Sequence, residues 1–220
     1  MLENELQVYC LKYAESVLEE NWIFEGGNKE KAIPISFCIY LIQSNKRNIL
    51  VDAGCDNMPG FDMKRFYSPT FVLRQIGFCV DDITDVVITH ADHDHIEAIR
   101  HFENAVVHIS KSEYQRARHF LLENKNINVF EKDLQLEPRI KIAVCGGHSI
   151  GSAIVEVNTK KGIHIFAGDE CYANICIDKK ISTGASFNKK ASIEFIEKYS
   201  NREYIVHTCH DISLKTKRII

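Results

Sequence analysis

Alternating hydrophobic and polar residues dominate the first part of the chain and predict β-strands. Residues 6–13 and 33–43 are both rich in β-forming residues, and the second of these segments alternates. Four apolar residues of the second segment share one face of the predicted strand: Ile35, Phe37, Ile39 and Leu41. Residues 48–54 form a further apolar segment after a polar turn and run into the sequence Asp52-Ala53-Gly54. The pattern therefore predicts a hairpin that leads into a loop.

The rest of the chain alternates between short apolar strands and segments with helical spacing. Strands are predicted over residues 86–88, 105–110, 139–147, 152–158, 162–169 and 203–211. Helices are predicted over residues 95–102, 111–124 and 188–200, and a shorter one ends near Gly77. Ser110 and Glu113 have the spacing of a capping box, which favours a helix start at residue 111.

Two strand-rich halves, each with helices on its outer side, predict an α+β protein in which two sheets pack as a sandwich. Neither a linker, a low-complexity tract nor a short repeat divides the chain. A length of 220 residues is enough for one well-buried core and short for two. We therefore expect residues 1–220 to form a single domain.

Composition and charge narrow the classes of partner. The chain has 27 basic and 30 acidic residues, a net charge of −3 and no long run of either sign. This balance argues against nucleic acid or an anionic membrane surface as the partner and favours small molecules or other proteins. No apolar run approaches the ~20 residues that span a bilayer. The N-terminal residues do not resemble a signal peptide, and the eight cysteines are scattered singly. We therefore expect a cytoplasmic protein with buried free thiols.

A concentration of metal-binding side chains follows the predicted strand at residues 86–88. Its spacing is His90-x-Asp92-x-Asp94-His95, at a point where a strand stops and a helix begins. Imidazole and carboxylate ligands on such a turn suit zinc, iron or manganese. The alternative interpretation is a polar turn in which Asp94 caps the following helix.

Further candidate ligands come at the ends of later strands. His148 follows two glycines in a turn, Asp169 ends an apolar strand, and His210 follows the last strand. A carboxylate at the end of a buried strand is costly unless it meets a cation. His207 is the alternative to His210, but its place in an alternating strand favours a packed core histidine.

In this order the residues resemble the metallo-β-lactamase superfamily, whose pattern is H-x-H-x-D-H, then a G-H turn, a strand-end Asp and a final G-H. The resemblance covers most of the chain and implies a four-layer αβ/βα sandwich with a two-metal site at one edge. It implies that one metal ion is held by His90, Asp92 and His148. It implies for the second ion the ligands Asp94, His95 and His210, with Asp169 bridging the two ions. A hydroxide between the ions would then be the nucleophile.

Asp92 departs from that pattern, because it stands where the family has histidine. An oxygen donor with a negative charge should favour iron or manganese, although zinc remains the metal expected of such a site. The flavodiiron branch is similar in having a carboxylate at this position. His93 is an alternative ligand, but an adjacent residue in an extended segment points the other way.

The pattern is closest to acyl-homoserine lactonase-like members, which carry a tyrosine three residues after the bridging aspartate. Tyr172 has this spacing from Asp169, and its phenol could assist a developing oxyanion or the leaving group. The alternative is a tyrosine that packs on the loop with its hydroxyl in water. The aromatic residues within residues 57–75 either line a substrate pocket or belong to the core.

The resemblance implies a metal-dependent hydrolase that opens an ester or lactone bond of a small molecule. In this hypothesis Asp94 and Asp169 orient the hydroxide, and Tyr172 assists at the carbonyl. The alternative is a di-iron redox protein that reduces oxygen or nitric oxide with a partner. A third possibility is a binding module that has the fold without catalysis. The sequence predicts neither the substrate nor the oligomeric state.

Overall fold

The computed structural model describes residues 6–220, which form two β-sheets. The larger sheet has seven strands in the order β12-β1-β2-β3-β4-β5-β6. These strands are β1 (Gln7–Glu19), β2 (Ala32–Gln43), β3 (Asn48–Val51), β4 (Asp85–Ile88), β5 (Val106–Ser110), β6 (Asn126–Phe130) and β12 (Lys217–Arg218). Strands β3 to β6 run parallel to one another, whereas β1, β2 and β3 pair antiparallel, so the predicted hairpin is present.

The smaller sheet has five strands in the order β11-β10-β9-β8-β7. These strands are β7 (Leu134–Glu137), β8 (Ile140–Val144), β9 (Ala153–Thr159), β10 (Gly162–Phe166) and β11 (Tyr204–His207). Neighbouring strands are antiparallel except β10 and β11, which run parallel. The ends of β10 and β11 therefore lie side by side.

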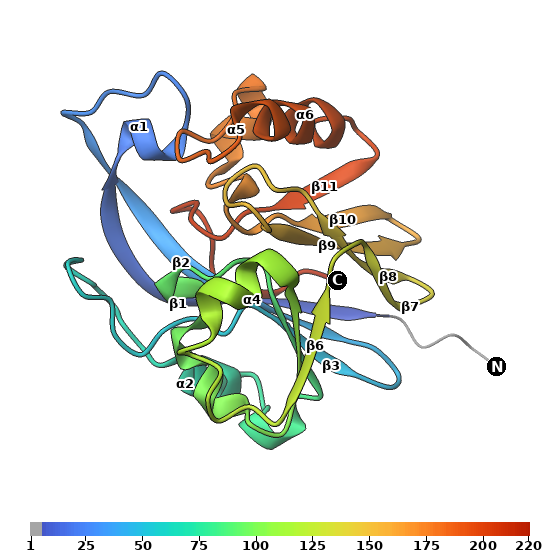
Figure 1. Ribbon diagram of the computed structural model, residues 1–220. Coiled ribbons are helices and arrows are strands. Elements are labelled where there is room, and N and C mark those ends of the chain that lie inside the picture. Colours follow the sequence, from blue (N-terminus) through green and yellow to red (C-terminus); the bar gives the residue numbers. More distant parts are fainter. Residues whose placement is uncertain (1–5) are drawn as a thin grey trace.

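Helices cover the outer faces of both sheets. They are α1 (Glu20–Ile23), α2 (Pro69–Gln75), α3 (His93–Ile96), α4 (Lys111–Ala117), α5 (Asn174–Lys179) and α6 (Lys189–Tyr199). Three short 3₁₀ helices occupy Val80–Asp82, Glu97–Phe102 and Gly168–Glu170. In Figure 1, α5 and α6 lie beyond the smaller sheet and α2 lies at the opposite end of the molecule, with α4 between them, next to β5 and β6. Among residues 6–220, no helix is both long enough and apolar enough to cross a bilayer.

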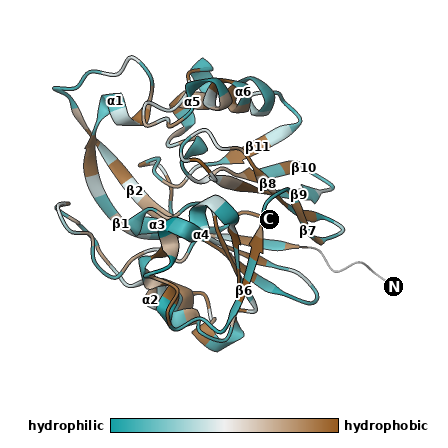
Figure 2. Cartoon of the chain, in the orientation of Figure 1, coloured by the Kyte–Doolittle hydropathy of each residue, from teal (hydrophilic) through white to brown (hydrophobic). Residues whose placement is uncertain are grey.

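The apolar residues of β2 show how the layers are held together. Ile35, Phe37, Ile39 and Leu41 share one face, as predicted, and pack with α2 and the 3₁₀ helix that follows α3. The alternate residues, including Tyr40 and Ile42, face the smaller sheet. A third cluster joins the smaller sheet to α5 and α6. Hydrophobic residues accordingly concentrate in the strands, as Figure 2 shows, and the α+β sandwich predicted from the sequence is confirmed.

Two predicted helices are shorter than the sequence indicated. The segment predicted as a helix over 95–102 divides into the single turn α3 and a 3₁₀ helix. The helix predicted over residues 111–124 ends at Ala117. Leu121 packs into the core beyond this point, and the chain must return to pair β6 in parallel with β5. Strands β6 and β7 had no counterpart in the sequence prediction.

Strand direction brings polar loops together at one edge of the sandwich. Asp52 follows β3, and His90 to His95 follow the neighbouring parallel strand β4. Asp169 and His210 follow the parallel strands β10 and β11 of the other sheet, and the β8–β9 turn contributes His148. The carboxyl ends of parallel strands share an edge, so residues far apart in the sequence converge there.

Candidate metal centre

The seven predicted ligands come together as two clusters on either side of Asp169. The first cluster is His90, Asp92 and His148, whose ligand atoms lie within 4.8 Å of one another. The second cluster is Asp94, His95 and His210, in which Asp94 Oδ2 lies 3.4 Å from His95 Nε2 and 3.5 Å from His210 Nε2.

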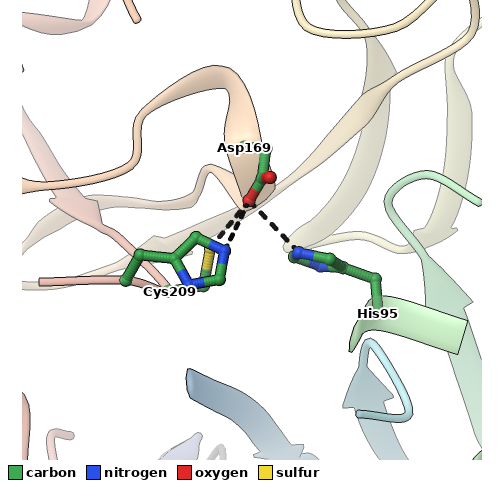
Figure 3. A group of neighbouring side chains, drawn as sticks. His95, Asp169 and Cys209 are labelled. Atoms are coloured by element: carbon green, nitrogen blue, oxygen red, sulfur yellow. Dashed lines mark hydrogen bonds and ion pairs between the residues drawn. The ribbon is translucent and has the colours of Figure 1, made fainter. Parts of the chain in front are cut away.

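The Asp169 carboxylate faces both clusters, one oxygen toward each. Its Oδ2 lies 3.6 Å from His90 Nε2 and 3.7 Å from His148 Nε2. Its Oδ1 lies 3.2 Å from His95 Nε2 and 3.1 Å from His210 Nε2. Figure 3 shows His95 and Asp169 pointing toward each other across the site. This arrangement is what a carboxylate bridging two cations requires.

Each histidine is oriented by a hydrogen bond from its other ring nitrogen. His148 Nδ1 donates to the Ala185 carbonyl at 2.7 Å, and His210 Nδ1 donates to the Ser36 carbonyl at 2.9 Å. The remaining two histidines have side-chain partners: His90 Nδ1 lies 3.0 Å from Thr89 Oγ1, and His95 Nδ1 lies 2.8 Å from Asp52 Oδ2. With hydrogen on Nδ1, all four rings turn an Nε2 lone pair inward, as metal-binding histidines do.

The inward nitrogens are the strongest sign that the site fits metal ions. The Nε2 atoms of His90 and His95 are buried and have no hydrogen-bond partner among the described residues. A buried polar atom without a partner is costly in a folded protein. Imidazole and carboxylate donors that converge on one small volume suit divalent transition metals. The residues present therefore fit two such ions.

Opposite charges across the site shift the pKa values of its groups. Burial lowers the pKa of His148, but Asp92 and Asp169 outweigh burial and raise it to about 9. Burial raises the pKa of Asp92, yet interactions with His148 and His90 hold it well below its usual range. The pKa of His95 is raised well above normal, because Asp169, Asp94 and Asp52 outweigh its burial. In the metal-free protein, the positive charge of protonated His95 and His148 therefore offsets the negative charge of the carboxylates.

Three buried carboxylates support the candidate ligands, and none of the three was predicted to lie at the site. Asp52 accepts hydrogen bonds from the backbone and hydroxyl of Thr89 as well as from His95. Glu170 accepts from the backbone nitrogens of Gly147 and His148. The third is Glu113, which binds backbone on both sides of the first cluster. The strand-end position of Asp52, directly after an apolar strand, was the one available signal.

Cys209 also lies at the site, whereas the sequence predicted only a buried free thiol there. Its thiol is buried and donates to Asp169 Oδ1 at 3.1 Å, as Figure 3 shows. Its sulfur and the donor atoms of His95, Asp169 and His210 all lie within 4.8 Å of one another. Cys209 stands where the family pattern has glycine, which was a signal available in the sequence.

The two alternative histidine ligands lie outside the clusters. His93 places its Nε2 2.9 Å from the Asn57 carbonyl, and its ring packs against Phe120. His207 is stacked on His164 and on Phe166 in the core. Burial lowers the pKa of His207 to about 3, so this ring is neutral. Asp92 and His210, rather than these two residues, face the site.

A large cavity opens onto the clusters. Its volume is about 1040 Å³, and Asp92, Asp94, Asp169 and His210 form part of its wall. Tyr172 lines the same cavity and is largely buried, with its ring 5.0 Å from that of His210 and 5.9 Å from that of His148. Burial raises the pKa of Tyr172 well above its usual value, so its phenol remains a hydrogen-bond donor at neutral pH.

The aromatic segment 57–75 contributes to both the cavity and the core. Phe61 lines the cavity and also packs against the core around β2. Phe66 packs against that core, whereas Phe71 is exposed and stacks on Tyr67. The two interpretations of this segment are therefore each true of some of its residues.

Comparison with known proteins gives a family match over most of the chain. The model of the family described as the metallo-beta-lactamase superfamily matches residues 39–204. An N-acyl homoserine lactonase of Bacillus cereus is 22% identical over 202 residues, covering 79% of this chain and 80% of the relative. An N-acyl homoserine lactonase of Bacillus thuringiensis is 20% identical over 179 residues, covering 70% and 71%.

Solved structures show the same fold. An N-acyl homoserine lactone hydrolase, with the product N-hexanoyl-L-homoserine at its catalytic metal centre, has a TM-score of 0.80 at 20% identity. The match covers 94% of this chain and 93% of that one. A dizinc quorum-quenching lactonase in complex with a product has a TM-score of 0.78 at 17% identity, covering 98% and 91%.

Proposed function

The chain belongs to the metallo-β-lactamase superfamily, and from this premise we propose that it is a hydrolase that opens the lactone or ester bond of a small molecule. The proposal assigns one divalent ion to the first cluster and one to the second, with Asp169 between them. The observation that carries it is the Asp169 carboxylate, which turns one oxygen toward the Nε2 atoms of each cluster.

Two divalent ions held by these residues would lower the pKa of a bound water toward neutrality and would polarise a carbonyl oxygen, which are the two requirements of lactone opening. The residues of this chain hold and orient the reacting groups. Asp94, on the cavity wall, can accept a hydrogen bond from the attacking water. Tyr172, a protonated phenol on the same wall, can donate to the carbonyl oxygen or to the leaving alkoxide.

The cavity favours a substrate with an apolar portion. Away from the clusters its wall contains Val17, Leu18, Trp22, Ile35, Phe61 and Phe120. Such a wall suits an alkyl chain, while the polar end places a carbonyl near the clusters. The relatives named above are N-acyl homoserine lactonases. We therefore propose lactones that carry an acyl chain as the substrate class.

Zinc is the metal proposed here, with iron or manganese as alternatives because Asp92 is an oxygen donor. One structural neighbour is a dizinc lactonase. The named relatives and neighbours are hydrolases, so the di-iron redox alternative gains no support from them.

The test combines elemental analysis with a substrate panel. Protein purified without a metal-binding tag is expected to contain two divalent ions per chain and to hydrolyse N-acyl lactones of increasing chain length. A chelator should abolish turnover, and added zinc should restore it. A metal-replete protein that leaves every lactone and ester intact would contradict the proposed reaction. Iron with a visible chromophore would favour the redox alternative.

A further inference from the structure

Asp92 is the one first-cluster ligand that departs from the family pattern, and the structure surrounds it with groups suited to a carboxylate. We propose that Arg116 is a positioning residue that allows Asp92 to serve as a metal ligand in place of histidine. This inference rests on the proposed metal centre. It concerns Arg116, Asp92 and Glu113, of which only Asp92 lies within the clusters.

The two oxygens of Asp92 have different environments. Oδ2 faces the first cluster, 3.2 Å from His148 Nε2 and 3.6 Å from His90 Nε2. Oδ1 points away and accepts a hydrogen bond from Arg116 Nη2 at 2.7 Å. A carboxylate can rotate about its Cβ–Cγ bond, and a donor on one oxygen restricts that rotation. Arg116 therefore fixes the rotation of the carboxylate, so that one of its two equivalent oxygens is held toward the first cluster.

Arg116 is itself held by a buried acid. Its Nη1 donates to Glu113 Oε2 at 2.7 Å, one turn earlier on α4. Glu113 is fully buried and also accepts from the backbone nitrogen of Ala91 at 2.9 Å and from that of Gly151 at 3.0 Å. Ala91 precedes Asp92, and Gly151 belongs to the turn that carries His148. Glu113, which holds Arg116, is thus hydrogen-bonded to the backbone on both sides of the first cluster.

Charge gives Arg116 a second role. Compared with a neutral imidazole, Asp92 adds one negative charge to the first cluster, which already faces the negative charge of Asp169. The guanidinium lies next to this added charge. One of its terminal nitrogens binds the Asp92 carboxylate, and the other binds the carboxylate of Glu113. It offsets the repulsion between the carboxylates in the metal-free protein and leaves Oδ2 free for the ion.

The position of the pair makes this restraint necessary. The Asp92 side chain is 37% exposed, whereas His90 is fully buried. Both Asp92 and Arg116 line the large cavity and a neighbouring cavity of about 550 Å³. Open space on both sides leaves this carboxylate less tightly packed than the buried side chains of the clusters. Arg116 supplies by hydrogen bonding the orientation that packing supplies to the buried ligands.

The inference predicts that the need for Arg116 depends on the residue at position 92. A histidine there would gain nothing from a guanidinium, because the outer ring nitrogen of a metal-binding histidine and the guanidinium are both hydrogen-bond donors. The two positions should therefore be energetically coupled. A salt bridge that only stabilises the surface would contribute similarly whichever metal ligand stood at position 92.

The experiment compares Arg116→Gln, Asp92→His and the double variant with the wild-type chain. Arg118→Gln is the matched control, because Arg118 lies at the end of the same helix, is exposed and stacks on Tyr114. Zinc bound per chain and the zinc affinity of each of the two sites are measured by competition with a chromophoric chelator. Thermal unfolding of the chelator-treated proteins establishes that each variant is folded.

Arg116→Gln is expected to weaken zinc binding at one site 10- to 100-fold, the range typical of residues that orient a ligand. The other site should be unchanged, and Arg118→Gln should bind as the wild type does. In the Asp92→His background, Arg116→Gln should change affinity less than threefold.

Three results would overturn the inference. The first is an Arg116→Gln variant that retains both ions at wild-type affinity, and the second is an equal loss of zinc affinity in both backgrounds. The third is a raised KM for a lactone with zinc binding unchanged, which would assign Arg116 to the substrate. A wild-type chain that binds no divalent metal would overturn the proposed function as well, so the two failures are distinguishable.

Discussion

The two clusters on either side of Asp169 differ in how their candidate ligands are held. In the second cluster, His95 is oriented by the buried Asp52 and His210 by a backbone carbonyl of β2. In the first cluster, Asp92 is partly exposed and depends on Arg116, a side chain that is itself 44% exposed. Buried hydrogen-bond partners hold the histidines of the second cluster, whereas a partly exposed side chain at the cavity wall holds Asp92 in the first. A buried cluster is preorganised by the fold, and an open one needs supporting residues of its own.

The difference follows from where each cluster lies in the sandwich. Asp52 directly follows β3, and its backbone nitrogen donates to the Val87 carbonyl of β4, so the sheet itself extends to the second cluster. His148 lies in a glycine-containing turn, which Glu113 and Glu170 hold from two sides. A Cβ at Gly147 would come within 2.3 Å of Glu170 Oε2, so that turn requires glycine. The first cluster is thus built from loops.

Asp169→Asn should affect both clusters, in contrast to changes at the other residues, because it removes the carboxylate that faces both of them. We expect kcat/KM for an acyl lactone to fall on the order of 10³-fold, since metal ions supply several kcal/mol of transition-state stabilisation. Zinc content should fall at both sites, as elemental analysis would show. The control is Asp178→Asn, an exposed aspartate on α5. Loss of only one ion would indicate that Asp169 belongs to one cluster.

Tyr172→Phe separates chemistry from metal binding, because Tyr172 contacts a histidine of each cluster without belonging to either. Loss of one hydrogen-bond donor at the reacting carbonyl should lower kcat about 100-fold. Zinc content and the melting temperature should stay at wild-type values. If kcat is unchanged, the phenol only packs on the loop, and the proposed role of Tyr172 is wrong.

Asp52→Asn should affect the second cluster more than the first, because Asp52 bonds His95 directly and reaches His90 only through Thr89. The amide provides one acceptor where the carboxylate provides two, so either Thr89 or His95 loses its partner. Zinc affinity at one site should fall 10- to 100-fold. Asp85→Asn is a matched control, because Asp85 is an equally buried carboxylate bonded to His108 at 2.7 Å. That control should lower the melting temperature without changing zinc affinity, and equal losses of affinity would contradict the assignment.

The smallest effect concerns the pH dependence of the metal-free protein. The pKa of His148 is raised to about 9 by its carboxylate partners. Its contribution to stability is therefore fully present below its unfolded pKa of ~6.5 and is lost as pH rises through about 9. Chelator-treated protein should lose a few degrees of melting temperature between these values. Asp92→Asn, which removes the charge opposite His148, should flatten this slope, and a wild-type curve without slope would contradict the prediction.

Much of the fold was predictable from local pattern. The two-residue period of residues 33–43 assigned Ile35, Phe37, Ile39 and Leu41 to one face, because side chains alternate along a strand. The helix predicted over residues 111–124 was too long for a non-local reason. Parallel pairing of β6 with β5 requires the chain to turn back, and local helical spacing carries no information about that pairing.

The candidate ligands were also predictable, since residue type and order are written in the motif His90-x-Asp92-x-Asp94-His95 and in its later partners. The contacts among them were not. Asp169 directs its two oxygens to different clusters because β4 and β10, from separate sheets, end at one edge. Arg116 reaches Asp92 across 24 positions of sequence only because α4 follows β5 at that edge. Pattern identifies the side chains that can bind metal, but tertiary structure decides which atoms face each other, because that depends on strand ends brought together from distant parts of the chain.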